Sequence, residues 1–151
     1  MRRSPWGSNT ALREGYRSGL EDTVAEQLRS LGVPVHYESV KIPYEVPQRP
    51  SKYTPDFWLP NGIVVETKGR YVSKDRQKHL LVKAQHPDLD IRFVFSRSRT
   101  PISKQSKTTY AMWCDKHGFL YADKLIPEEW LDEPTLPERR AALDALLEST
   151  K

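Results

Sequence analysis

An aspartate and a Glu-x-Lys pair flank a predicted turn at residues 60–62. The residues on either side are β-prone or apolar, so the segments 53–59 and 63–68 are predicted to be the arms of a β-hairpin. Because side chains alternate along a strand, Glu66 and Lys68 point to one side, where Asp56 on the neighbouring arm can join them. Two carboxylates suit Mg²⁺, and a nearby ammonium can orient or deprotonate an attacking water. The arrangement therefore favours phosphodiester hydrolysis.

The same three side chains also fit a solvated hairpin face with a weak cross-strand ion pair. Two neighbouring features favour a site instead. Val64-Val65 predicts a buried strand, in which an acidic side chain is costly unless it is paired or bound to metal. Gly69, directly after Lys68, allows another backbone or a ligand to approach closely.

A helix predicted over residues 19–31 supplies a third acidic candidate. Ser18 and Glu21 have the spacing of a capping box, apolar residues follow at helical spacing, and Gly32 ends the pattern. Glu21 borders the apolar stripe near the helix N-terminus, whereas Asp22 is predicted to face further outward. Glu21 can therefore cap the helix, face an active-site cleft, or do both.

The remaining pattern is that of one α/β domain. Residues 35–44 are strand-like, and residues 43–55 contain four prolines, which predicts a stiff loop or a bridge that exchanges elements between two chains. Ser73 is predicted to cap a helix that runs to about Gln85, and residues 91–95 predict a buried strand. Further elements are expected at 109–116 (helix), 119–121 (strand) and 138–148 (acidic amphipathic helix).

Positive charge is concentrated before residue 127. The net charge is +4, residues 127–151 carry −4, and the rest carries +8, an excess that suits a phosphate-binding body. The candidate DNA-binding residues lie in the first 17 residues and in the loop after the 91–95 strand: Arg2, Arg3, Arg13, Arg17, Arg97, Arg99, Lys104 and Lys107. A plain disordered terminus and a solvated loop are the alternatives.

Composition excludes several classes of protein. A chain of 151 residues is long enough for one domain, and its single cysteine, Cys114, excludes an intrachain disulfide and a cysteine-rich zinc site. No apolar run approaches the ~20 residues of a membrane span, and the first residues lack the apolar core of a signal peptide. An intracellular protein with no membrane partner is expected.

Several blocks of sequence resemble a known family. Glu21, Pro55-Asp56 and Glu66-x-Lys68 are similar to the PD-(D/E)-x-K nuclease motif with its leading helical glutamate. More narrowly, the chain resembles the endonuclease I family of T-odd bacteriophages, which resolves four-way (Holliday) junctions. Seven blocks carry this resemblance, in the same order along the chain: residues 17–22, 53–57, 59–63, 65–69, 78–81, 86–92 and 122–127.

This resemblance implies a restriction-endonuclease-like core, with a central mixed sheet flanked by helices, in a domain-swapped homodimer. Each active site would take Glu21 from one chain and the hairpin residues from the other. Glu21, Asp56 and Glu66 are implied as catalytic metal-site residues, the carbonyl of Thr67 as a further ligand, and Lys68 as the residue that serves the water. The implied cofactor is Mg²⁺, for which Mn²⁺ substitutes.

The expected organisation is a flexible basic arm over residues 1–17, a nuclease domain over 18–130 with a Pro-rich bridge near 43–52, and an acidic tail with a possible helix over 131–151. The acidic tail departs from the family, so no DNA contact is expected after about Pro134.

The expected function is metal-dependent resolution of four-way junctions and other branched DNA. The setting would be the cytoplasm of an infected bacterial host, or the bacterial cytoplasm if a prophage encodes the protein. The alternatives are another nuclease of the same core, of a mismatch-nicking, restriction or transposon-end type, and a non-catalytic protein that binds branched DNA.

Overall fold

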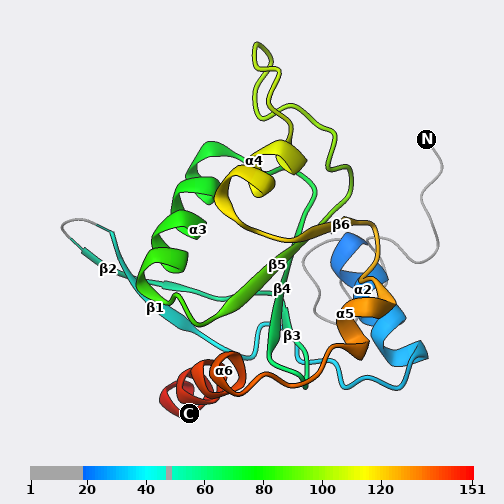
Figure 1. The fold of residues 1–151 in the computed structure, drawn as a ribbon, viewed down its shortest axis with the longest axis vertical. Coiled ribbons are helices and arrows are strands. Elements are labelled where there is room, and N and C mark those ends of the chain that lie inside the picture. Colours follow the sequence, from blue (N-terminus) through cyan, green and yellow to red (C-terminus); the bar gives the residue numbers. More distant parts are fainter. Residues whose placement is uncertain (1–18, 47–48) are drawn as a thin grey trace.

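The computed structural model describes residues 19–46 and 49–151. A mixed sheet with the strand order β3-β4-β5-β6 lies at its centre, beside a two-stranded sheet of β1 and β2 (Figure 1). The strands are β1 (Ile42–Val46), β2 (Arg49–Tyr53), β3 (Phe57–Trp58), β4 (Ile63–Lys68), β5 (Asp90–Phe95) and β6 (Tyr121–Asp123). The helices are α2 (Gly19–Ser30), α3 (Ser73–Gln85), α4 (Tyr110–His117), α5 (Glu128–Asp132) and α6 (Pro137–Thr150). The expected α/β class with a mixed sheet flanked by helices is confirmed.

The predicted hairpin is present, with a shorter first arm than expected. β3 pairs antiparallel with β4, and Phe57 lies opposite Val65. Tyr53 ends β2 instead of belonging to this arm, because Pro55 has no N–H to donate to a ladder and interrupts the run. At the tip Gly62 has φ 95°, a conformation that favours glycine, and it donates to the Leu59 carbonyl. β4, β5 and β6 continue the sheet in parallel.

Alternation along β4 assigns each face of the sheet to a different set of helices. Val64 packs in a core with residues of α3, α4 and α6, whereas Ile63 and Val65 pack with α2 and α5. Figure 1 shows these helices on opposite sides of the sheet. By the same alternation Glu66 and Lys68 lie on the α3 side.

Helix α2 confirms the first predicted helix and corrects one of its side chains. The helix ends at Ser30, Gly32 follows at φ 71°, and Val33 N–H donates to the Leu28 carbonyl. Ser18, the expected cap, lies outside the described residues. Asp22 was expected to face outward, yet it is only 1% exposed. It lies one turn before Ala25, on the packed side of the helix, so the first turn is enclosed.

Three other predictions need correction. Ser73 does not cap α3: Val72 holds that position, makes no side-chain cap bond, and Ser73 begins the helix. The strand expected at 119–121 is β6, two residues later, because Phe119 still bonds back to the end of α4. Of the strand expected at 35–44, only a Tyr37–Phe57 bridge forms before β1 begins at Ile42. The helix predicted at 109–116 is α4, capped by Thr109 and ended by Gly118.

The Pro-rich segment folds back on itself within this chain. β1 and β2 pair antiparallel, and Pro43 lies opposite Lys52 and Glu45 opposite Pro50. The described parts of the segment therefore form a strand pair, and residues 47–48 lie outside the described residues.

Helix α6 is anchored to the tip of the β3–β4 hairpin. Leu143 and Leu146 are buried in the core, and Arg139, 4% exposed, donates from Nε to the Asn61 carbonyl at 3.0 Å. A Cβ on Gly62 would lie 3.0 Å from Arg139 Cγ, so the close approach of α6 is a second reason for glycine at this turn. Within the described residues no helix has the length and apolar character needed to cross a membrane.

Candidate active site

The side chains predicted to act together line one cavity of 540 Å³. α2 supplies Glu21, the segment before β3 supplies Asp56, and β4 supplies Glu66, Thr67 and Lys68. The other lining residues are Glu38, Lys52, Tyr53, Thr54, Asp75 and Lys78. Residues from five separate parts of the sequence, around positions 21, 38, 52–56, 66–68 and 75–78, thus form a single acidic site that also contains three lysines.

Asp56 is held by the strand next to it. Its Oδ2 accepts hydrogen bonds from the Thr67 N–H at 2.9 Å and from the Thr67 hydroxyl at 2.7 Å. Only 6% of the residue is exposed. Both bonds go to one carboxylate oxygen, which orients the group and leaves Oδ1 for another partner.

Glu66 and Lys68 are held from the α3 side. The Tyr53 hydroxyl donates to Glu66 Oε1 at 2.7 Å, and Lys68 Nζ lies 3.6 Å from Glu66 Oε2. Lys68 Nζ also donates to Asp75 Oδ2 in α3 at 3.2 Å. The lysine is therefore pinned between two carboxylates at the wall of the cavity.

Glu21 meets Asp56 beside a carboxylate that the sequence patterns missed. Glu21, Glu38 and Asp56 each offer an oxygen, and these atoms all lie within 4.8 Å of one another. The Tyr37 hydroxyl donates to Glu21, and the Glu38 N–H donates to the Asp56 carbonyl at 2.7 Å. No sequence pattern marked Glu38, because residues 35–44 were expected to form a regular strand. In the structure Glu38 instead has a positive φ of 47°.

The electrostatics are those of crowded, buried acids. Burial, and then the charge of Glu21, raises the pKa of Asp56 to about 6. Burial, and then the charge of Asp56, raises the pKa of Glu66 to about 8. Burial alone would lower the pKa of Lys68, but Glu66 and Asp75 together raise it, so the lysine is an ammonium at neutral pH. Buried oxygen donors that resist ionisation together fit a divalent cation, whose charge would relieve their repulsion.

This crowding predicts that the metal-free protein becomes less stable as pH rises from 6.5 to 8. In that range a glutamate in the unfolded chain has already lost its proton, while Glu66 in the folded state still holds one until about pH 8. Ionisation therefore favours unfolding by about 1.4 kcal/mol per pH unit. Below 6.5 His79, whose pKa burial lowers, opposes this trend. The measurement is urea denaturation in EDTA across this range.

Glu66→Gln is the matched variant for that measurement. It should remain folded and be more stable than the wild type at pH 8. Its free energy of unfolding should not decline between pH 6.5 and 8, because the amide has no proton to release. Saturating Mg²⁺ should also reverse the decline in the wild type. A wild-type curve that is flat or rises between pH 6.5 and 8 in EDTA would contradict the expectation.

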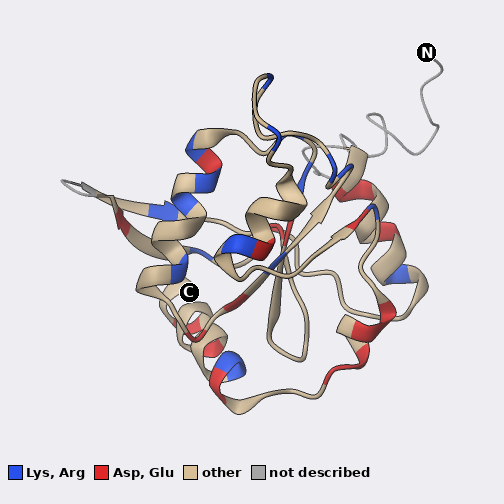
Figure 2. Cartoon of the chain, turned by 45° about the horizontal axis from the view of Figure 1, so that its top comes forward, with Lys and Arg blue, Asp and Glu red and all other residues tan. Residues whose placement is uncertain are grey.

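Of the basic residues predicted to bind DNA, those that the structure describes do not line this cavity. Arg97, Arg99, Lys104 and Lys107 are exposed on the loop between β5 and α4, and none of them lines the cavity. Figure 2 shows basic residues on this loop and on α3, and acidic residues along α2 and α5. The other four candidates, Arg2, Arg3, Arg13 and Arg17, lie outside the described residues.

Tyr53, Asp75, Lys52 and Lys78 are the other site residues that sequence reasoning missed. The sequence patterns assign Tyr53 to a strand arm, and they do not mark Asp75. Lys78 Nζ lies 3.7 Å from Asp75 Oδ1 and 5.3 Å from the centre of the Tyr53 ring. Tyr53 and Asp75 lie close in sequence to Asp56 and to the Glu-x-Lys motif. That closeness indicates site residues only once α3 is known to lie against β4.

Comparison of the sequence with known proteins identifies its family. The family model described as phage endonuclease I matches residues 4–150. Over 119 residues the chain is 59% identical to Endonuclease I of Escherichia phage T7, covering 79% of this chain and 80% of that protein. It is 57% identical to Endodeoxyribonuclease 1 of Enterobacteria phage T3, covering 79% and 78%. With its motif residues gathered in one acidic cavity, the chain belongs to the phage endonuclease I family.

Proposed function

We propose that this protein is a metal-dependent endodeoxyribonuclease that resolves four-way junctions and other branched DNA. The observation that carries the proposal is the convergence of Glu21, Asp56, Glu66 and Lys68 on one cavity, with all three carboxylates less than a tenth exposed. The names of its relatives, an endonuclease and an endodeoxyribonuclease, support nucleic acid as the substrate.

Asp56 and Glu66 would hold Mg²⁺, or Mn²⁺ in its place, with Glu21 and the Thr67 carbonyl as further ligands. Glu38 lies close enough to Glu21 and Asp56 to join them. When bound, the cation supplies positive charge that polarises the scissile phosphate and stabilises the leaving oxygen. Its ligands are kept in place by Thr67 and Tyr53, which bond the carboxylates of Asp56 and Glu66.

Lys68 contributes as a fixed cation. Because its ammonium is held by Asp75 and Glu66, it can donate a hydrogen bond that orients the attacking water or the phosphate. Water attacks phosphorus, the bond from phosphorus to the 3′ oxygen breaks, and that oxygen takes a proton. The products are a 5′-phosphate and a 3′-hydroxyl. This use of Lys68 favours orientation of water over its deprotonation, the other role open from sequence.

The assembly we propose is a domain-swapped homodimer with a restriction-endonuclease-like core. Contacts between residues 19–46 and 49–151 include Tyr37 with Phe57, Gln27 with Ile126, β1 with β2, and the packing of α2 in the core, and a second chain can supply each of them equally well. Exchange at residues 47–48 would keep all of them and place Glu21 of one chain beside Asp56 of the other. Charged loop residues, including Arg97 and Arg99, would then contact the arms of a junction.

Incubation with a synthetic four-way junction and a matched duplex, with and without Mg²⁺, tests the function. We expect the junction alone to be cut efficiently, only with Mg²⁺, and to give ligatable 5′-phosphate ends. Equal cleavage of duplex and junction would indicate a nuclease without structural selectivity. Binding without cleavage at any metal concentration would contradict the proposal.

A further inference from the structure

A second hollow opens beside the acidic cavity, between α3 and the β1–β2 strand pair. It measures 820 Å³ and shares the lining residues Lys52, Asp75 and Lys78 with the acidic cavity, so the two hollows are adjacent. Its other lining residues are Tyr44, Val46, Ser51, Ser73, Lys74, Gln77 and Leu81. We call this hollow the α3 groove.

The side chains that line the α3 groove carry a net positive charge, whereas those that line the acidic cavity carry a net negative charge. Lys52, Lys74 and Lys78 line it against one carboxylate, Asp75. Asp75 is engaged by Lys68 at 3.2 Å and by Lys78 at 3.7 Å. Lys52 and Lys74 are exposed, and within the described part of the chain neither has an acidic partner. Their ammonium groups are therefore available to an anionic ligand.

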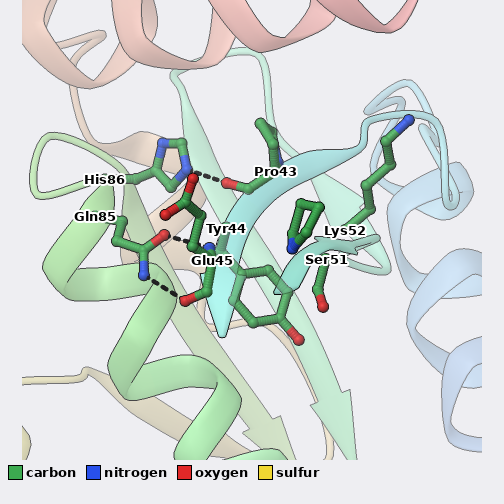
Figure 3. Close-up of a pocket in the computed structure, with 8 residues that line it drawn as sticks. Pro43, Tyr44, Glu45, Ser51, Lys52, Gln85 and His86 are labelled. Atoms are coloured by element: carbon green, nitrogen blue, oxygen red, sulfur yellow. Dashed lines mark hydrogen bonds between the residues drawn. The ribbon is translucent and has the colours of Figure 1, made fainter. Parts of the chain in front are cut away.

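The walls of the α3 groove are tied together at one end. Gln85 at the end of α3 accepts from the Glu45 N–H at 2.6 Å and donates to the Glu45 carbonyl at 2.8 Å, and His86 bonds to the Pro43 carbonyl. Figure 3 shows Gln85 and His86 reaching β1 on one side of the strand pair, while Lys52 extends away from them. Side-chain bonds from the end of α3 to the β1 backbone thus join the two walls without involving the groove lysines.

Charge decides which way a DNA strand can leave the acidic cavity. A strand cut there is a polyanion, and its neighbouring phosphates must pass over an adjacent surface. On the α2 side the helix carries Glu21 at the cavity and the exposed Glu26, whereas on the α3 side the lining carries the three lysines. Figure 2 shows acidic residues along α2 and basic residues on α3. Tyr44 and Leu81 add apolar surface against which sugars or bases can lie.

We propose that the α3 groove binds the sugar-phosphate backbone of the cleaved strand next to the scissile phosphate, with Lys52 and Lys74 at successive phosphates. The inference rests on the proposed nuclease function, since it assumes that DNA enters the acidic cavity. It adds to that function a binding site on α3 and β2, apart from the loop between β5 and α4.

Salt dependence of binding tests the groove. The Lys52→Gln/Lys74→Gln double variant is compared with Lys41→Gln/Lys116→Gln, which removes two exposed lysines outside the groove. Affinity is measured in Ca²⁺ without cleavage, at several salt concentrations, for a junction, a duplex and a single strand. Each lost phosphate contact lowers the salt slope by about 0.9 on duplex arms and weakens binding roughly tenfold near 0.1 M salt. The salt slope of the groove variant should therefore fall by about 1.8, and the salt slope of the control variant should not change.

A neutral methylphosphonate, placed one to four nucleotides to either side of the cut, locates the contact. In the wild type it should weaken binding at two adjacent positions, and in the groove variant a methylphosphonate at those positions should leave binding unchanged.

Equal salt slopes for the groove variant and its control on all three DNAs would overturn the proposal. Failure of the proposed function is recognised separately, because the wild type would then not cleave the junction in Mg²⁺ whatever its salt slope. Melting temperatures of both double variants should match the wild type.

Discussion

Asp56→Asn, Glu66→Gln and Lys68→Ala are each expected to reduce junction cleavage by at least about a thousandfold, or about 4 kcal/mol of transition-state stabilisation. The first two remove a charge that would hold the metal, and the third removes the ammonium that lies between Glu66 and Asp75. The hydrogen bonds from Thr67 to Asp56 and from Tyr53 to Glu66 can persist, since an amide oxygen accepts them equally. The folded structure should therefore survive.

Junction binding by the same variants should stay within roughly tenfold of the wild type, because affinity comes from many phosphate contacts. Single-turnover cleavage and binding in Ca²⁺ are the two measurements. Asp115→Asn and Lys116→Ala, exposed on α4, are matched controls that should cut normally. Wild-type cleavage by any one of the three site variants would remove that residue from the active site.

Mixing two inactive variants is expected to restore nicking if active sites are shared between chains. In a swapped heterodimer of Glu21→Ala and Asp56→Asn, one site collects both defects and the other has none. Nicking should return from an undetectable level to about that of one site, whereas paired cleavage of both strands should not. The reason is geometric: Glu21 precedes residues 47–48, and Asp56, Glu66 and Lys68 follow them.

The matched control for that experiment is Asp56→Asn mixed with Glu66→Gln. Both residues follow residues 47–48, so every site of the heterodimer keeps one defect and no activity should return. The chains are co-refolded and tested on a junction with one labelled strand at a time. If Glu21 serves its own chain, as α2 packs in the single chain, the first mixture will stay inactive too.

Much of the site was predictable because its residues lie on short, local patterns. The turn at Gly62 and the apolar run before Glu66 predict the β3–β4 hairpin, which brings Asp56, directly before β3, to Glu66 on β4, and alternation puts Lys68 beside Glu66. Helical spacing and Gly32 delimit α2 for the same reason. Each of these depends on residues fewer than about fifteen positions apart.

Other features could not be predicted, because they depend on packing between distant segments. Asp22 is buried since the first turn of α2 is enclosed, and Asp75 meets Lys68 because α3 packs across β4. Glu38 turns toward Asp56 at a positive φ that no propensity favours for glutamate. A linear pattern cannot show which face of one element another element will cover.

The sequence by itself therefore determined the chemistry: a pair of acids and a lysine on one hairpin, a third acid on the preceding helix, and the family to which they belong. Only the tertiary structure decided the setting of that chemistry. It brought Glu38, Tyr53 and Asp75 to the site, and it placed a lysine groove on α3 rather than on α2. The physical reason is that residue type and local spacing set what a side chain can do, whereas burial, pKa and neighbouring charge arise only when separate elements pack together.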